Sequence, residues 1–265
     1  NYKDHATTFT SLVELAEDRG DTFFVGDLVG YGENLANVTL QTNNLNTSFA
    51  GSYWPWVKTR SAELSRDVWS PASTVMPGVY AYNDRVAAPW FAPAGTRRGG
   101  ITNATSTGYI SSEGEFVAVA LNEGQRDTLY SLNINPITFI TGAGLVNFGQ
   151  KTRARGASSL DRINVARLVI FLRSQLNKLA KPYIFEPNDK ITRDEIKQAA
   201  ESLCLELVGS RALYDYLVVC DESNNTPSRI DKNELYLDIA IEPVKAVEFI
   251  YIPLRLKNTG EIAGL

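Results

Sequence analysis

Apolar residues recur at helical spacing close to the start of the chain: Phe9, Leu12, Val13 and Ala16. Because residues three or four apart lie on one face of an α-helix, this spacing predicts an amphipathic helix over residues 4–18. Gly20 is a natural end for that helix, and the apolar run at 22–29 predicts a buried strand. A helix that passes directly into a buried strand is typical of α/β folds.

Aromatic residues with a strand pattern dominate the next segment. Residues 53–57 include two tryptophans and are interrupted by a proline, which predicts a strand with a break. Pro and Gly then cluster over residues 70–108, so we expect ordered but irregular structure there, with a helix near 77–85. Residues 117–132 favour a further helix or turn. The apolar run after them ends in Gly142-Ala143-Gly144.

The strongest helical periodicity lies in the second half of the chain. Ser158 or Ser159 is a suitable N-cap for a helix that extends to about residue 180. The core-facing positions of this helix are Val165, Leu168, Val169, Leu172, Leu176 and Leu179. Thr192 and Glu195 have the spacing of a capping box and predict the start of a second helix, which ends near Gly209.

Strand patterns follow these helices. Residues 213–220 form an apolar run, and residues 235–242 alternate between apolar and polar, so both predict strands. A last strand, predicted over 247–256, is apolar on both faces: Val247, Phe249, Ile250, Tyr251, Ile252, Leu254 and Leu256. Such a strand near a chain end promotes aggregation unless it is paired. It is either a central strand of a sheet in this chain or a strand added to the sheet of a neighbouring subunit.

The composition is that of an ordinary globular protein. The 265 residues are 44% hydrophobic and 21% charged, which excludes an intrinsically disordered chain. The net charge of −4 shows that the chain as a whole is not a polyanion binder. A nucleic-acid-binding module is an alternative that would use a local phosphate-binding patch, but no recognition motif accompanies it. The residues of that patch would be Arg97, Arg98, Lys151, Arg153 and Arg155.

Catalytic chemistry has no positive support in the sequence. His5 is the only histidine, which disfavours His-based metal sites and Ser-His or Cys-His catalysis. Cys204 and Cys220 lie outside any CxxC pair, so we expect two reduced, buried residues. The Gly142-Ala143-Gly144 sequence lacks the third glycine of a dinucleotide loop and favours a tight turn. The sequence also contains no P-loop and no apolar run of membrane-spanning length. We therefore expect no enzyme activity, no cofactor and no metal.

Positive charge is concentrated in the helix predicted near residues 159–181, where five basic residues accompany a single acid, Asp161. The basic residues are Arg162, Arg167, Arg173, Lys178 and Lys181. The second face of this helix also presents Ile163, Ile170 and Phe171, where an exposed helix would be polar. The helix is therefore either buried on two sides within its own domain or packed against another surface.

Seven segments form a recognisable series along the chain: SYWPWVK (52–58), MPG (76–78), APWFAPAGTRRGGI (88–101), LNINPITFITGAGLVNFGQKTRA (132–154), SSLDRINVARLVIFLRS (158–174), IFEPND (184–189) and IEPVKAVEFIYIPL (241–254). Together, in this order, they resemble the C-terminal part of a contractile phage tail sheath protein of the T-even type. Phe148-Gly149-Gln150 departs conservatively from the Trp-Gly-Ala of many relatives.

This resemblance implies a structural role for the chain. Sheath subunits polymerise as six-fold rings or helical strands around a tail tube, and contraction drives the tube through the host envelope. The implied fold is an α/β (α+β mixed) one, a mixed sheet flanked by helices. We expect residues 1–115 to complete the sheath core domain and residues 116–265 to form the sheath C-terminal domain. The chain is then a piece of a longer subunit.

The resemblance also implies partners and site roles. The partners are further copies of the chain, the tail tube, and the baseplate and tail terminator proteins, without membrane insertion or direct contact with nucleic acid. The protein would assemble in the host cytoplasm and reside in the virion tail. The basic residues of helix 159–181 would face the tube, and the strand at 247–256 would link neighbouring subunits. A sheath subunit of a bacterial contractile injection system is the nearest alternative.

Overall fold

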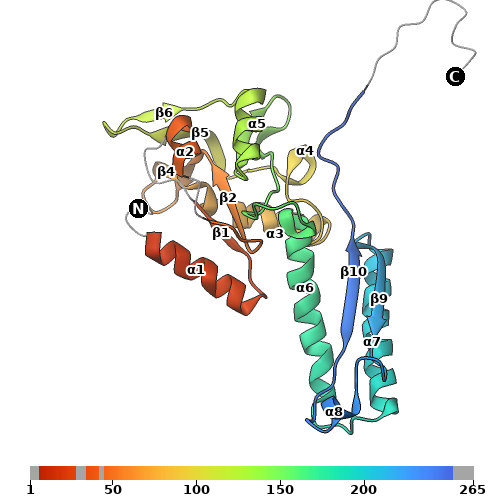
Figure 1. Ribbon diagram of the computed structural model, residues 1–265. Helices are drawn as coiled ribbons and strands as arrows, with labels where there is room; N and C mark the ends of the chain where they lie inside the picture. Colours follow the sequence, from red (N-terminus) through yellow and green to blue (C-terminus); the bar gives the residue numbers. More distant parts are fainter. Residues whose placement is uncertain (1–5, 28–33, 42–44, 253–265) are drawn as a thin grey trace, which may run out of the picture.

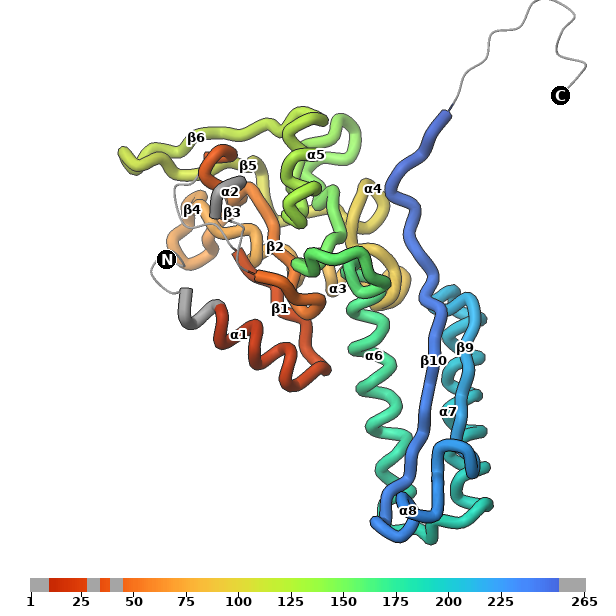
Figure 2. The backbone as a smooth tube through the Cα atoms, in the orientation of Figure 1, coloured from red at the N-terminus to blue at the C-terminus, as the bar shows by residue number. Residues whose placement is uncertain are grey.

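The computed structural model describes residues 6–27, 34–41 and 45–252. These residues form two lobes, a first lobe and a stem that begins with α6 (Ile163–Ala180) (Figures 1 and 2). Helix α6 extends from the first lobe to the far end of the stem, and strand β10 (Asp238–Pro243) brings the chain back along it. The C-terminal segment then passes the first lobe again.

The first lobe combines short helices and strands, which confirms the predicted mixed α/β class. Its elements are α1 (Ala6–Arg19), β1 (Phe24–Gly26), α2 (Leu35–Gln41), β2 (Ala50–Trp54), β3 (Trp56–Ser61), β4 (Arg66–Ser70), η2 (Ala72–Thr74), α3 (Met76–Val86), α4 (Gly95–Arg98), β5 (Ala104–Ile110), β6 (Phe116–Ala118), α5 (Glu123–Ser131), β7 (Asn135–Ile140), β8 (Gly144–Asn147) and η3 (Ser159–Asp161). The predicted helices at 4–18 and 77–85 correspond to α1 and α3. The strand predicted over 22–29 is described only as the short β1.

A mixed four-stranded sheet lies at the centre of the first lobe. Its order is β1-β2-β7-β8, with β1, β2 and β7 parallel and β8 antiparallel to β7. Strand β2 is buried along its whole length, as expected for a parallel strand covered on both faces. Tyr53 packs with Met76 and Val79 of α3, and the next residue, Trp54, packs with Leu129 of α5. Consecutive strand residues point to opposite faces, so helices cover both sides of this sheet.

Pro55 separates the two sheets of the first lobe. It stands between β2 and β3, and β3 belongs to a second, antiparallel sheet of order β4-β3-β5-β6. Proline cannot donate a ladder hydrogen bond, so the strand predicted over 53–57 is divided as its proline indicated. The tight turn predicted at Gly142 and Gly144 is also confirmed, because both residues have positive φ, of 85° and 80°, and join β7 to β8.

The stem is built from two helices and a two-stranded antiparallel sheet: α6, η4 (Lys181–Tyr183), α7 (Lys190–Gly209), β9 (Leu213–Val219), α8 (Pro227–Ile230) and β10. Its core consists of Leu168, Leu172, Ala200, Cys204 and Leu207, together with residues of β9. Cys204 and Cys220 are both buried and unpaired, which confirms their expected state.

Both long helices begin differently from the predictions. Ser158 caps the short η3 by accepting a hydrogen bond of 3.1 Å from the Leu160 amide, and α6 begins only at Ile163. The capping box predicted at Thr192 and Glu195 is wrong. Asp189 caps α7 by accepting a hydrogen bond of 2.9 Å from the Thr192 amide, so Thr192 already lies in the first turn.

The lobes do not divide where the sequence suggested. The expected boundary between residues 115 and 116 falls between β5 and β6, which are hydrogen-bonded neighbours in one sheet. Strands β7 and β8, also beyond that boundary, complete the mixed sheet with β1 and β2. The chain leaves the first lobe only at the start of α6, because pairing between distant strands, not local composition, decides which residues belong together.

Asp27 is a buried carboxylate at the end of β1. It accepts a hydrogen bond of 3.0 Å from the Ser73 amide and a second from the Ser73 hydroxyl, and so connects β1 to η2. Burial raises the pKa of Asp27 from its ordinary 3.8 to about 6, although the bonds from Ser73 act in the opposite direction. The folded state therefore holds a proton that the unfolded state releases between about pH 4 and pH 6.

Asp27→Asn is expected to remove this pH dependence. A raised carboxyl pKa makes the wild-type fold less stable as the pH increases through 4 to 6, by on the order of 2–3 kcal/mol. Urea unfolding at several pH values should show that this loss is absent from the Asn variant and retained in the exposed control Asp18→Asn. Identical pH profiles for wild type and Asp27→Asn would contradict the assignment.

Candidate assembly surfaces of the stem and the C-terminal segment

Arg167, one of the five basic residues predicted to face a partner, is used inside the chain. Its Nη2 lies 2.6 Å from Asp84 Oδ2 of α3, and its guanidinium lies 4.7 Å from the centroid of the Tyr80 ring. Only 12% of the Arg167 side chain is exposed. Arg167 therefore ties α6 to α3, and reversing its charge would place two carboxylates together in a part-buried site.

Arg162, the second of these residues, also has partners in the chain. Its Nε and Nη2 lie 2.6 Å and 2.9 Å from the two carboxylate oxygens of Glu248, and its Nη1 lies 3.2 Å from Asp161. These hydrogen bonds from Nε and Nη2 form a bidentate fork of the kind that gives Arg–carboxylate pairs their geometric specificity. Arg162 and Glu248 are 28% and 16% exposed, so water screens this pair only partly.

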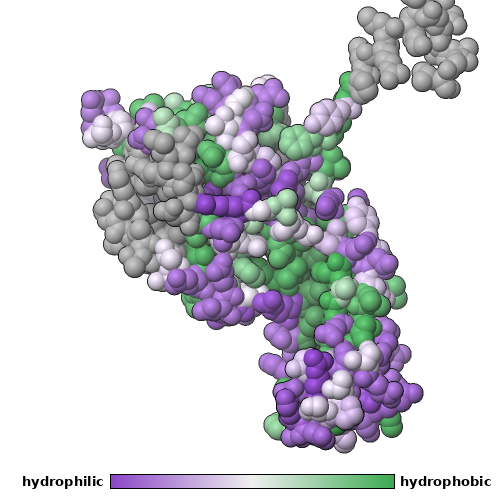
Figure 3. All heavy atoms as spheres, viewed as in Figure 1, coloured by the Kyte–Doolittle hydropathy of each residue, from purple (hydrophilic) through white to green (hydrophobic). Residues whose placement is uncertain are grey.

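The other three basic residues are exposed. Arg173 lies over Gly20 at the end of α1, where an added Cβ would be 1.6 Å from its Nη1. Lys178 and Lys181 lie at the end of α6, near the stem tip, and form no ion pair with any residue in the described ranges. Figure 3 shows that the stem tip is mostly hydrophilic. The structure thus separates the predicted set into two structural arginines and three exposed cations.

The apolar second face of α6 is covered within the chain. Ile163 is fully buried in the first-lobe core, and Phe171 packs against Trp90, with ring centroids 5.3 Å apart. Trp90 also donates a hydrogen bond of 3.1 Å to the Ser210 carbonyl oxygen. Of the two interpretations that the sequence left open, burial within the same chain is the correct one for Ile163 and Phe171.

The C-terminal segment, residues 244–252, has no strand partner among the described residues. A strand was expected over 247–256, and its described part, 247–252, forms no strand with any described residue, so within the described residues this segment is not a central strand. The exposed side chains and their exposed fractions are Val247 77%, Phe249 65%, Ile250 77%, Tyr251 88% and Ile252 82%. Leu254 and Leu256 lie outside the described residues. Four consecutive apolar side chains, from Phe249 to Ile252, are therefore open to solvent.

The stem hairpin has open edges. Strands β9 and β10 pair only with each other in the described part of the chain, so each keeps one edge of unpaired backbone groups. Ile239 and Ile241 pack toward the stem core, whereas Tyr214 and Leu217 are 63% and 62% exposed. A two-stranded sheet with free edges is a suitable acceptor for an added strand.

The patch proposed for nucleic-acid binding is not a surface patch. Arg153 is 2% exposed, and its Nη1 donates hydrogen bonds to the Leu132 and Asn133 carbonyl oxygens. Lys151 Nζ donates a hydrogen bond of 2.8 Å to the Tyr130 carbonyl oxygen, and burial lowers the pKa of Lys151. With two of its five members turned into the protein, the patch cannot present a continuous row of phosphate contacts.

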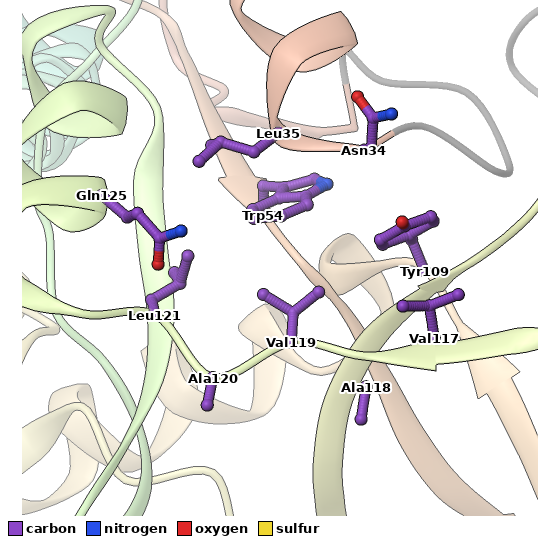
Figure 4. Close-up of a pocket in the computed structure, with 10 residues that line it drawn as sticks. All are labelled: Asn34, Leu35, Trp54, Tyr109, Val117, Ala118, Val119, Ala120, Leu121 and Gln125. Carbon is purple, nitrogen blue, oxygen red and sulfur yellow. The ribbon is translucent and has the colours of Figure 1, made fainter.

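An apolar hollow of about 330 Å³ lies between α2, the β5–β6 strands and the start of α5 (Figure 4). Trp54, Leu121 and Tyr109 line it, and none of its lining residues carries a formal charge.

The described residues contain no cluster of His, Cys, Asp or Glu that could hold a metal. No described helix has the length and apolarity needed to cross a membrane.

Glu248 is the functional candidate that the sequence analysis missed. In sequence it is the only acid in the apolar run from 246 to 252, and that isolation is the signal that could have drawn attention to it. Its role becomes visible only in the fold, because its partner Arg162 is 86 residues away. Gln150 Nε2 also donates a hydrogen bond of 3.1 Å to Glu248 Oε1.

Comparisons with known proteins show which family the chain resembles. Residues 157–257 match the phage tail sheath C-terminal domain. The chain is 38% identical over 203 residues to the tail sheath protein of Vibrio phage KVP40, and 35% identical over 204 residues to that of Enterobacteria phage T4. These alignments cover 75% and 74% of the chain but only 29% of each relative.

A solved structure shares the fold. The sheath complex of an extracellular contractile injection system, PVC, in its contracted state aligns with a TM-score of 0.74 at 21% identity. The alignment covers 89% of this chain and 64% of that one, so it includes both lobes. The chain therefore belongs to the tail sheath protein family, and its residues 157–257 form the sheath C-terminal domain.

Proposed function

We propose that this chain is part of a sheath subunit that polymerises around a phage tail tube and contracts to drive the tube through the host envelope. The observation that supports this best is the coexistence of an exposed apolar C-terminal segment and a stem hairpin with free edges. The same subunit thus carries both the segment that could be added as a strand and a sheet edge that could accept such a strand. A head-to-tail contact of this kind repeats from subunit to subunit and produces an open polymer.

The energetics favour pairing of the segment with another copy. Phe249, Ile250, Tyr251 and Ile252 are each at least 65% exposed. Burying large apolar side chains contributes about 1.5–3 kcal/mol each, from which the cost of ordering the strand is subtracted. The backbone N–H and C=O groups of these residues would also exchange their hydrogen bonds to water for hydrogen bonds to the unpaired edge of β9 or β10. A neighbour's hairpin is therefore a better partner for the segment than solvent.

The stem tip is our candidate for the surface that faces the tube. Lys178 and Lys181 remain available there, and Arg173 is exposed nearer the first lobe, beside Gly20, whereas Arg162 and Arg167 are engaged within the chain. Exposed ion pairs contribute about 0.2–1 kcal/mol each, and salt screens them. A surface that must hold the tube before contraction and release it afterwards is well served by many weak contacts.

The proposed activity needs no catalytic site. Sheath contraction converts one lattice of subunits into another that buries more surface, so the energy is stored during assembly. The sequence contains no P-loop, in accordance with a process that does not hydrolyse nucleotides. The sequence relatives reported above are phage proteins, which favours a virion tail over a bacterial injection system as the setting.

The double variant Phe249→Asp/Tyr251→Asp should remain a folded monomer and fail to form sheath. Two charges in the added strand would have to be buried in the neighbour's sheet, at a cost that exceeds the gain from pairing. Sedimentation velocity and electron microscopy of the full-length subunit would measure polymer formation. Leu64→Asp/Val86→Asp changes two apolar residues elsewhere that are 53% and 50% exposed, and this control should polymerise normally. Striated cylinders formed by the Phe249/Tyr251 variant would reject strand addition.

Lys178→Glu/Lys181→Glu should weaken binding of the full-length subunit to purified tubes by about tenfold or more, because attraction becomes repulsion at every subunit. Cosedimentation with tubes at increasing salt would measure the affinity of the subunit for the tube. The difference in affinity between the variant and the wild type should shrink as the salt concentration rises. Arg66→Glu/Arg97→Glu makes the same charge change at exposed positions of the first lobe and serves as the control. Equal loss in both variants would show that only overall charge matters.

A further inference from the structure

The C-terminal segment is fixed to the body at two points before it becomes exposed. The first is Val244, whose amide donates a hydrogen bond of 3.0 Å to the Ala212 carbonyl oxygen. The second is Glu248, which is held by Arg162 and Gln150. From Phe249 onward the described side chains are mostly exposed. The body therefore holds the segment up to Glu248 and leaves the next residues available to a partner.

The second attachment is the more specific of the two. Glu248 accepts both arms of the Arg162 fork and a bond from Gln150, and it is 16% exposed. Tyr130 lies beside the same carboxylate, and its burial, together with the Glu248 charge, raises the pKa of the Tyr130 hydroxyl. A bidentate, part-buried Arg–carboxylate pair is directional in a way that an exposed lysine pair is not.

A strand that is apolar on both faces needs such an external constraint. In most strands, the apolar face fixes the register, because a slip of one residue turns every side chain to the opposite face. Here both alternating sets are apolar: Phe249 and Tyr251 on one face, and Ile250 and Ile252 on the other. Slipped pairings would therefore bury nearly as much apolar surface as the correct one, and the hydrophobic pattern alone cannot select between them.

We propose that Glu248, held by Arg162 and Gln150, is an anchor that fixes the register of the strand passed to a neighbouring subunit, so that this strand begins at Phe249. The proposal rests on the strand addition proposed above. While Glu248 stays in the Arg162 fork, its side chain is held on its own subunit, and Phe249 is the first residue beyond that attachment, so the anchor sets where the exchanged strand begins. It also passes any pull on the strand to the start of α6 instead of to the end of β10.

The anchor can be tested in the monomer, independently of assembly. Lys245 lies between the two attachment points and is exposed, so trypsin cleavage after it reports how often the segment leaves the body. Glu248→Gln and Arg162→Gln should each increase the cleavage rate about tenfold, and the double variant should add little more. Glu242→Gln, an exposed glutamate on β10, is the matched control. Unchanged cleavage in Glu248→Gln would overturn the anchor.

Register is then measured in assembled sheaths of the full-length subunit. Tyr251→Cys is combined, one at a time, with cysteines at successive positions of β9 and of β10, and disulfide formation between subunits is mapped. The native Cys204 and Cys220 are buried and remain in place. With Glu248 present, one position on one strand should crosslink strongly. With Glu248→Gln, crosslinks should spread to positions one and two residues away along that strand.

The outcomes separate the two proposals. A single crosslinked position that persists in Glu248→Gln would refute the anchor's role in register while leaving strand addition intact. An absence of crosslinks at every position in sheaths with Glu248 present would refute strand addition to the stem hairpin, whatever the trypsin result. Arg162→Lys keeps the positive charge but loses the fork, so it should resemble Arg162→Gln if the bidentate geometry is what matters.

Discussion

The first turns of α6 pack into one hydrophobic core in each lobe, and the rest of the architecture depends on that burial. Ile163 belongs to the first-lobe core, and Leu168 belongs to the stem core, little more than one helical turn later. Asn164 lies between them and donates hydrogen bonds to the carbonyl oxygens of Trp90 and Val244. Because one short stretch of helix serves two cores, the lobes are held together by packing in addition to the covalent chain.

Charge on α6 has two different uses, and position along the helix separates them. The arginines near its start are paired with Asp84 and Glu248 and hold other elements in place. The cations near its end are exposed. A count of basic residues treats all five alike, because the partners that distinguish them are 83 and 86 residues away in the sequence. Only the contacts show which of these charges are free.

Periodicity predicted the long elements well and the short ones poorly. The apolar spacing in α3, α6 and α7 reflects one buried face, so sequence alone located these helices to within a few residues. Strand β4, with the sequence RDVWS, shows no clear alternation, and its place in a sheet depends on its pairing with β3. The start of α7 moved because Asp189 and Thr192 are both good caps, and the local sequence does not decide between them.

For the candidate site, too, the sequence showed the local patterns but not the contacts between distant residues. The unusual composition of 247–256 was visible in the sequence, and so was the concentration of cations on one helix. Neither pattern showed that Arg162 binds Glu248, because that contact is created by the return of the chain along the stem. Side chains that act through distant partners, such as Gln150 and Tyr130, carry no local signal at all.

Helix α6 also makes the stem a lever. The Glu248 anchor lies at its start, and Lys178 and Lys181 lie at its far end (Figure 1). Eighteen residues of α-helix span about 27 Å. A rotation of about ten degrees around the anchor would therefore carry the stem tip sideways by about 5 Å, enough to separate an ion pair, while the residues at the fulcrum hardly move. Under the proposed function, a small turn of the body would release the contacts of the stem tip with the tube and preserve the link to the neighbouring subunit at the anchor.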